Sequence, residues 1–159
     1  MTSSGAMTTA TDCYTCAHEA AGRNAPPWER IATDDHWRVA HAFNTAVPGW
    51  LVLVPRRHVT ALAELTDAEA ATLGSWQVRL SRALARVLGC QKTYIAQFAE
   101  AEGFAHVHFH VVPRPPDLAR ELRGPRIFQL LGSTDDSRVG REEMTRLAAE
   151  LAGELARQR

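Results

Sequence analysis

The stretch AHVHFHVVPR, residues 105–114, gives the clearest indication of the fold in this sequence. Histidine occupies every second position, at His106, His108 and His110, and hydrophobic residues stand between and after them. Because alternate side chains of a β-strand point to opposite faces of the sheet, this pattern predicts a strand over His106–Val112. One face of the strand carries the three imidazoles, and the other packs on the core.

Three imidazoles on one face point to chemistry of two kinds. They could bind a transition metal, as histidines do in zinc sites. Alternatively, one of them acts as a nucleophile or acid–base group and its neighbours set its tautomer. Pro113 is expected to end the strand's hydrogen-bond ladder, and Arg114 follows it with a guanidinium suited to a phosphate or carboxylate.

The rest of the chain adds two helices and further strands. Thr66 and Glu69 form a capping box at the start of an apolar stripe that ends at Gly89, which predicts a long amphipathic helix. A weaker stripe, Met144–Leu155, predicts a C-terminal helix. We expect a pair of strands around the turn Asp34-Asp35 within Trp28–Phe43, followed by a strand over Trp50–Val54 that is either buried on both faces or central in the sheet. A further strand is expected over Lys92–Phe98, and a loop over residues 114–125. This order predicts an α+β fold with an antiparallel sheet.

The length and the charge of the chain indicate how many domains it forms and which partners are unfavourable. The 159 residues fit one domain, which we expect over residues 12–159, after a flexible polar tail at residues 1–11. The 18 basic and 18 acidic side chains leave no global basic field, which argues against nucleic acid as the main partner. No apolar run is long enough for a membrane helix and no segment resembles a signal peptide, so a cytoplasmic protein is expected.

Cys13 and Cys16 form a Cys-x-x-Cys pair near the start of the predicted domain. In a reducing compartment such a pair indicates metal binding or redox chemistry before a structural disulfide. Two thiolates are half of a tetrahedral zinc site, and a buried thiol pair is the plain alternative. Cys90 is expected to be a small buried hydrophobe.

The chain resembles the histidine-triad (HIT) family. His106–Val112 matches the family motif His-φ-His-φ-His-φ-φ in full, where φ is hydrophobic, and residues 48–59 (PGWLVLVPRRHV) are similar to the family's strand before the main helix. The resemblance spans residues 13–114. It implies a five-stranded antiparallel sheet with two helices, a homodimer, and a nucleotide as the small-molecule partner. It further implies cleavage at the α-phosphate of a nucleoside phosphoramidate or a dinucleoside polyphosphate.

The resemblance also assigns catalytic roles. His108 would attack the α-phosphate and form a nucleotidyl-histidine, from which water releases a nucleoside monophosphate. His110 would lie near the transferred phosphate or the leaving group, and His106 would orient the others or bind metal. The substrate-binding residues implied are Asn44 for the ribose, Gly103 through its backbone amide, and Arg114.

Two segments depart from the family pattern. Trp50 stands where many members carry a fourth histidine. Residues 101–105 (AEGFA) replace a segment in which many members carry a hydroxyl side chain that contacts phosphate. These departures keep the expected nucleophile, His108, but affect which substrate is bound and how fast it reacts.

Members of the family with an N-terminal Cys-x-x-Cys often bind a structural zinc. The resemblance implies Cys13, Cys16, His58 and His106 as the four ligands here. With four protein ligands the metal has no open coordination position, so it would be structural and not catalytic.

Three other functions compete with hydrolysis. A nucleotidyltransferase would share the intermediate but pass the nucleotide to an acceptor other than water, which a product assay detects. A nucleotide-binding zinc module without turnover would form no adduct on His108. A catalytic metal held by the histidine triad would be lost when His108 or His110 is replaced.

Overall fold

The computed structural model describes residues 12–134 and 136–158, so the predicted tail at residues 1–11 lies outside the described residues. Five strands form one sheet in the order β1-β2-β3-β5-β4, and every neighbouring pair is antiparallel. Their bounds are β1 Ala32–Thr33, β2 Trp37–His41, β3 Leu51–Pro55, β4 Thr93–Gln97 and β5 Phe109–Pro113. The predicted α+β class with a five-stranded antiparallel sheet is confirmed, and β3 is central as expected.

Three α-helices lie within the described residues: α1 Tyr14–Ala21, α2 Asp67–Leu88 and α3 Arg141–Arg157. The capping box that predicted α2 is present, since Thr66 Oγ1 accepts from the Glu69 N–H and the Glu69 carboxylate accepts from the Thr66 N–H. Gly89 ends the helix in the left-handed conformation, with φ of 68°. No helix in the described ranges combines the length and apolar character needed to cross a membrane.

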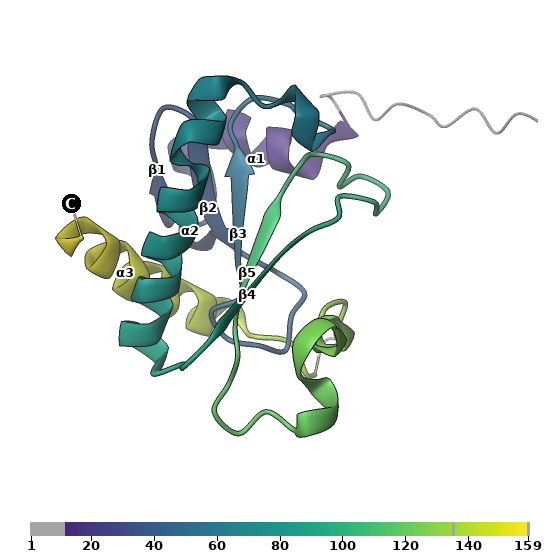
Figure 1. The fold of residues 1–159 in the computed structure, drawn as a ribbon, viewed down its shortest axis with the longest axis vertical. Coiled ribbons are helices and arrows are strands. Elements are labelled where there is room, and N and C mark those ends of the chain that lie inside the picture. The colour runs from purple at the N-terminus through teal and green to yellow at the C-terminus, as the bar shows by residue number, and fades with distance from the viewer. Residues whose placement is uncertain (1–11, 135, 159) are drawn as a thin grey trace, which may run out of the picture.

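Helices α2 and α3 cover one face of the sheet (Figure 1). Every second residue of β2, β3 and β5 points into this layer, including Val39 of β2, Leu53 of β3, and Phe109 and Val111 of β5. Leu80, Leu84, Leu147 and Leu151 of the two helices meet them. The hydrophobic half of the alternating histidine segment therefore packs into the core, as its period of two predicts.

The opposite face of the sheet carries the intervening side chains. Arg38 and Ala40 of β2, Val52 of β3 and His110 of β5 point to this side. It is covered by α1 and by the segment after β5, which contains the 3-10 helices η5 (Arg120–Leu122) and η6 (Gly124–Leu130), the green segment at the lower right of Figure 1. This partly covered face is where a ligand can reach the sheet.

The strand β5 is shorter than predicted. It begins at Phe109, and the stretch His106–His108 lies outside it. The ladder between β3 and β5 ends at the pair Leu53 and Phe109, although β3 continues to Pro55 in its pairing with β2. The Val107 N–H donates instead to the Val59 carbonyl, outside this ladder. The alternation of residue types in one segment cannot report where its pairing with a neighbouring strand stops.

Other elements also differ from expectation. Trp28 was predicted within a strand but lies in the 3-10 helix η3 (Pro27–Glu29), because Pro26 and Pro27 set up a helical turn. The expected loop over residues 114–125 contains η5. The short helix α1 was not predicted, since only eight residues form it and no strong apolar stripe marks them.

We predict that Thr66→Ala lowers the free energy of unfolding by about 1 kcal/mol, because the first turn of α2 loses one half of its capping box. Urea denaturation followed by circular dichroism measures this change. Thr145→Ala on the exposed face of α3 is the matched control and should change stability by less than about 0.5 kcal/mol. Equal effects of the two substitutions would contradict the role given to the cap.

Candidate functional site

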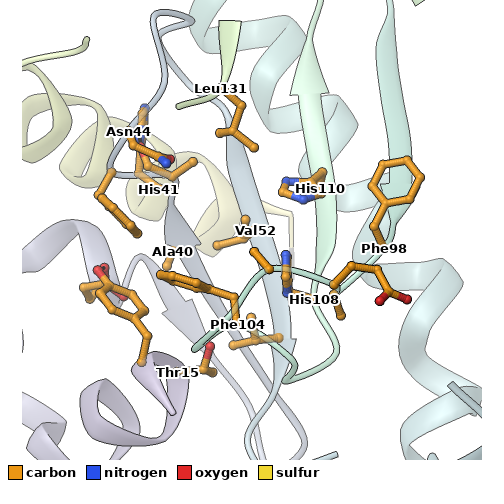
Figure 2. A pocket seen from close by; sticks show the side chains of 18 of the residues that line it. Thr15, Ala40, His41, Asn44, Val52, Phe98, Phe104, His108, His110 and Leu131 are labelled. Atoms are coloured by element: carbon orange, nitrogen blue, oxygen red, sulfur yellow. Dashed lines mark hydrogen bonds between the residues drawn. The ribbon is translucent and has the colours of Figure 1, made fainter. Parts of the chain in front are cut away.

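A cavity of about 310 Å³ lies on the face of the sheet opposite the helices. Figure 2 shows it from close by, with His108 and His110 between Asn44 at one end and Phe98 at the other. Its walls come from α1, from β2 and the residues that follow it, from β3 and β5, from the loop between β4 and β5, and from η6 and the residue after it. Its size is at the lower end of the range for small-molecule sites.

The floor of the cavity is the sheet itself. His110 pairs with Val52 of β3, which in turn pairs with Ala40 of β2, so the three side chains stand in a row across neighbouring strands. Small and apolar residues beside the imidazole leave room above the sheet. The rigid strands, and not a loop, therefore position His110.

His108 is held in one tautomer by the backbone. Its Nδ1 lies 2.8 Å from the carbonyl oxygen of His106. A carbonyl only accepts, so the Nδ1 of His108 carries the proton and its Nε2 carries a lone pair. Burial lowers the pKa of His108, which keeps this ring neutral at physiological pH. A neutral imidazole with a free Nε2 lone pair is a nucleophile.

His110 is held in the opposite tautomer. The indole Nε1–H of Trp50 donates to its Nδ1 at 3.0 Å. Burial, and to a smaller extent electrostatic repulsion from the neighbouring His108, lower the pKa of His110 to about 3. This neutral ring therefore carries its one proton on Nε2 and is a hydrogen-bond donor.

The two imidazoles stand next to each other on the cavity wall, with ring centroids 4.9 Å apart and planes at 81°. One offers a lone pair at Nε2 and the other an N–H at Nε2. A pair of this kind is chemically able to attack an electrophile with one ring and to donate a hydrogen bond to its oxygen substituents with the other.

The end of the cavity nearest α1 is aromatic. Tyr14, Phe43 and Phe104 pack on one another, with ring centroids 5.0 to 5.9 Å apart. Asn44, next in the chain after Phe43, also lines the cavity and offers an amide side chain (Figure 2). An aromatic wall with one amide suits a planar ring joined to a sugar.

A buried ion-pair network lies below this end. Arg38, only 1% exposed, donates to the carboxylates of Glu19 and Glu29, and to the carbonyl oxygens of Glu29 and Thr15. Glu29 also accepts from the hydroxyl of Tyr14 at 2.6 Å. The network ties α1 to β2. Arg38 is the one Arg or Lys among the described residues of the cavity wall, and its charge is already paired with the two carboxylates.

The opposite end contains residues that sequence analysis did not single out. Phe98, 58% exposed, packs edge-on against Phe128 of η6, and Phe128 packs edge-on against His110. Glu100 lines the wall beside them. Phe128 lies beyond the segment that carries the family resemblance, so no motif pointed to it.

A second group of side chains meets next to the cavity. Cys13, Cys16, His58 and His106 bring one ligand atom each within 4.8 Å of one another. The Sγ of Cys16 lies 3.2 Å from the Nδ1 of His58 and 3.6 Å from the Nδ1 of His106. Ligands at zinc distances and tetrahedral angles are separated by about 3.6 Å, so the four residues fit one metal ion.

The tautomer of His106 also fits a metal site. Its Nε2 lies 2.8 Å from the carbonyl oxygen of Pro55, which only accepts, so this nitrogen carries the proton. The Nδ1 is then unprotonated and faces the two thiols, 3.6 Å from the Sγ of Cys13. His106 does not line the cavity, so the structure separates it from His108 and His110, which the sequence pattern put on one face with it.

The other residues named from the sequence divide between the wall and its surroundings. Asn44 lines the cavity, whereas Gly103 and Arg114 do not. The carbonyl of Gly103 accepts from the Tyr14 N–H, and the Arg114 N–H donates to the Lys92 carbonyl. His41 lines the cavity, but both its ring nitrogens are engaged, with the Ala42 carbonyl and the Gly49 N–H.

Comparisons with known proteins agree with this fold. The model of the HIT domain matches residues 24–117, and the chain therefore belongs to the HIT domain family. A search among curated proteins found no match. The matched segment includes the histidine triad and His58. Cys13, Cys16 and Phe128 lie outside it.

Solved structures show the same fold at low sequence identity. A Zn-bound histidine triad family protein from Mycobacterium smegmatis has a TM-score of 0.67 and 21% identity, over 95% of this chain and 100% of that one. A histidine triad protein from Bradyrhizobium japonicum has a TM-score of 0.65 and 23% identity, over 79% and 89%. The diadenosine triphosphate hydrolase of Plasmodium falciparum has a TM-score of 0.61 and 14% identity, over 82% and 78%.

Proposed function

We propose that the protein is a nucleotide hydrolase that forms a covalent nucleotidyl intermediate on His108. The observation that carries this proposal is the pair of opposite tautomers on the cavity wall. The Nδ1 of His108 donates to the His106 carbonyl, and the Nδ1 of His110 accepts from Trp50. A lone pair and an N–H then stand side by side where a phosphate can reach both.

The reaction has two steps. In the first, the Nε2 of His108 forms a bond to the α-phosphorus, and the bond to the leaving group breaks with its electron pair on that group, which takes a proton from water. In the second, water attacks the phosphorus, the Nε2–phosphorus bond breaks, and a nucleoside monophosphate leaves while a proton passes to solvent. His110 donates a hydrogen bond from its Nε2 to a phosphate oxygen in both steps.

The nucleoside would lie at the aromatic end of the cavity. Tyr14, Phe43 and Phe104 supply the apolar wall for the base, and Asn44 supplies an amide for the ribose hydroxyls. The reacting phosphate then falls between the two histidines. The leaving group extends towards Phe98 and Phe128.

The charge of the cavity favours an amine leaving group over a polyphosphate. Among the described lining residues, Arg38 is the cationic side chain, and it is already paired with Glu19 and Glu29. Glu100 adds a negative charge beside the leaving-group end. A polyphosphate would carry several negative charges into a site without a free cation, whereas a nucleoside phosphoramidate releases an uncharged or cationic amine.

We further propose that the cluster of Cys13, Cys16, His58 and His106 holds a structural zinc ion. The four ligand atoms meet at zinc-like separations, and a solved structure of similar fold is described as Zn-bound. Zinc would fix the start of α1 against the histidine segment. Tyr14 and Thr15 lie between the two cysteines and line the cavity, so the metal would hold one cavity wall in place.

The homodimer remains a prediction. β4 is an edge strand of the sheet, and Ile95 on it is 43% exposed, which gives a second copy a surface on which to pair. Sedimentation equilibrium would give the oligomeric state, and a monomer at micromolar concentration would contradict the prediction.

We predict that His108→Ala abolishes the covalent intermediate and lowers the release of AMP from an adenosine phosphoramidate by at least about 10³-fold, because no other described group replaces its lone pair. Intact-protein mass spectrometry after brief mixing detects the adenylyl adduct. His36→Ala, away from the cavity, should keep both the adduct and the activity.

Two outcomes would contradict the proposed function. Full turnover by the His108→Ala protein would exclude the assigned nucleophile. Nucleotide binding without adduct or AMP in the native protein would identify a binding module instead. Product analysis also separates hydrolysis from transfer, since a transferase would release AMP joined to an added acceptor.

We predict that Glu100→Gln raises kcat/KM for a diadenosine polyphosphate by about two- to fivefold relative to an adenosine phosphoramidate, since one exposed charge contributes about 0.4–1 kcal/mol. Glu102→Gln is the matched control, because Glu102 is exposed nearby and does not line the cavity. A native preference for the polyphosphate, unchanged by either substitution, would refute the charge argument.

We predict one zinc ion per chain, lost when Cys16→Ser or His58→Ala removes a ligand, together with a lower melting temperature. Elemental analysis of the purified proteins measures the metal. His108→Ala and His110→Ala should retain it, because neither residue belongs to the cluster. Loss of metal in these two variants would instead support a catalytic metal on the triad.

A further inference from the structure

Trp50 contacts His110, one of the two triad imidazoles that line the cavity. It precedes β3 and is 0% exposed. Its ring packs edge-on against His110, with centroids 5.8 Å apart, and against Phe128, with centroids 5.1 Å apart. The contact with His110 is also a hydrogen bond, from the indole Nε1–H to Nδ1 at 3.0 Å.

The chemistry of indole makes this hydrogen bond one-directional. The indole nitrogen donates and cannot accept, and it does not titrate in the physiological range. A hydroxyl, an amide or an imidazole at the same place could accept as well as donate, so it would allow either tautomer of His110. Trp50 allows one tautomer only, the one with the proton on Nε2.

The surroundings keep Trp50 in this position. Its backbone N–H donates to the Val47 carbonyl, and its own carbonyl accepts from the Ala42 N–H. The side chain is enclosed in a cluster with Val47, Val112 and Ile127, and no other hydrogen bond of the indole is found among the described residues. Turning the indole away would leave its N–H buried without an acceptor, which is unfavourable.

We propose that Trp50 is a positioning residue that holds His110 as a permanent Nε2–H donor towards the reacting phosphate. This proposal rests on the proposed function for its kinetic consequence and on the structure alone for the tautomer. His110 then stabilises negative charge on a phosphate oxygen but relays no proton, because its Nδ1 cannot accept one without losing the bond from Trp50. The proton that the leaving group needs comes from water, as in the two-step reaction above.

This assignment separates the two histidines by role. The His106 carbonyl makes His108 the ring with a lone pair at Nε2, and Trp50 makes His110 the ring with a proton there. Neither role depends on a bound substrate. The site is therefore set for attack before the nucleotide arrives, and no tautomer exchange is needed during the reaction.

The tautomer is measured directly by two-bond ¹⁵N–¹H correlation spectra of the full chain labelled with ¹⁵N-histidine, with His110→Gln used to assign the signal. We expect His110 to show the pattern of a neutral ring protonated on Nε2. In Trp50→Phe the signal should report a mixture of tautomers. A native His110 protonated on Nδ1 would overturn the proposal, even if Trp50→Phe fails to fold.

Kinetics of AMP release provide the second readout. Trp50→Phe should lower kcat by about tenfold and change KM by less than about threefold. This is less than the effect of removing a charge-stabilising donor altogether, because the Nε2–H tautomer stays partly populated. A native kcat together with a single Nε2–H tautomer in Trp50→Phe would refute the positioning role.

Trp37→Phe is the matched control. Trp37 is equally buried, and its indole N–H donates to the Glu69 carbonyl and Thr72 on the helix side of the sheet, away from His110. It should lose stability without changing the His110 spectrum or kcat. An equal loss of kcat in this control would mean that Trp50 acts through packing alone. Absence of the His108 adduct would refute the proposed function. The tautomer of His110 would still be tested, because the NMR measurement does not depend on turnover.

Discussion

The hydrogen bond from the Nε2–H of His106 to the carbonyl of Pro55 is the constraint on which the site depends. It joins the last residue of β3 to the segment that leads into β5, at the point where the regular ladder between the two strands has not yet begun. With Nε2 occupied, the Nδ1 of His106 faces the two cysteines. The carbonyl of the same residue sets the tautomer of His108. One residue thus links the metal cluster to the proposed nucleophile through its ring and its backbone.

The two faces of the sheet differ in their surroundings: one packs against helices, and the other lines the cavity. On the first, apolar side chains of β2, β3 and β5 pack against α2 and α3. On the second, Arg38, Ala40, Val52 and His110 line a cavity, whose walls include α1, the loop between β4 and β5 and the segment after β5. Arg38 of β2 ties α1 and η3 to the sheet, because its guanidinium donates to Glu19 and Thr15 of α1 and to Glu29 of η3. The end of the cavity that receives the nucleoside in our proposal is therefore fixed by the same contacts that hold the N-terminal helix.

The family match covers residues 24–117, yet the site extends beyond both of its ends. Before it lie Cys13, Cys16 and the wall residue Tyr14, and after it lie Phe128 and Leu131. Identities of 14–23% to the solved structures named above support the fold alone. The argument for function accordingly rests on this chain's own geometry. These flanking segments contribute Tyr14, Phe128 and Leu131 to the cavity wall.

Much of this protein could be predicted from local sequence patterns. The capping box and apolar stripe predicted α2, the alternating pattern predicted that Phe109 and Val111 pack into the core, and the triad identified the family. These features follow from residue spacing, because a helix repeats every 3.6 residues and a strand every two. The division of labour within the triad does not follow from spacing. It depends on the partners of each ring, namely the Pro55 carbonyl, the His106 carbonyl and the Trp50 indole, and two of these lie more than 50 residues away along the chain. Only the tertiary structure brings such groups within hydrogen-bonding distance, and so only the tertiary structure decides which nitrogen of each imidazole carries the proton.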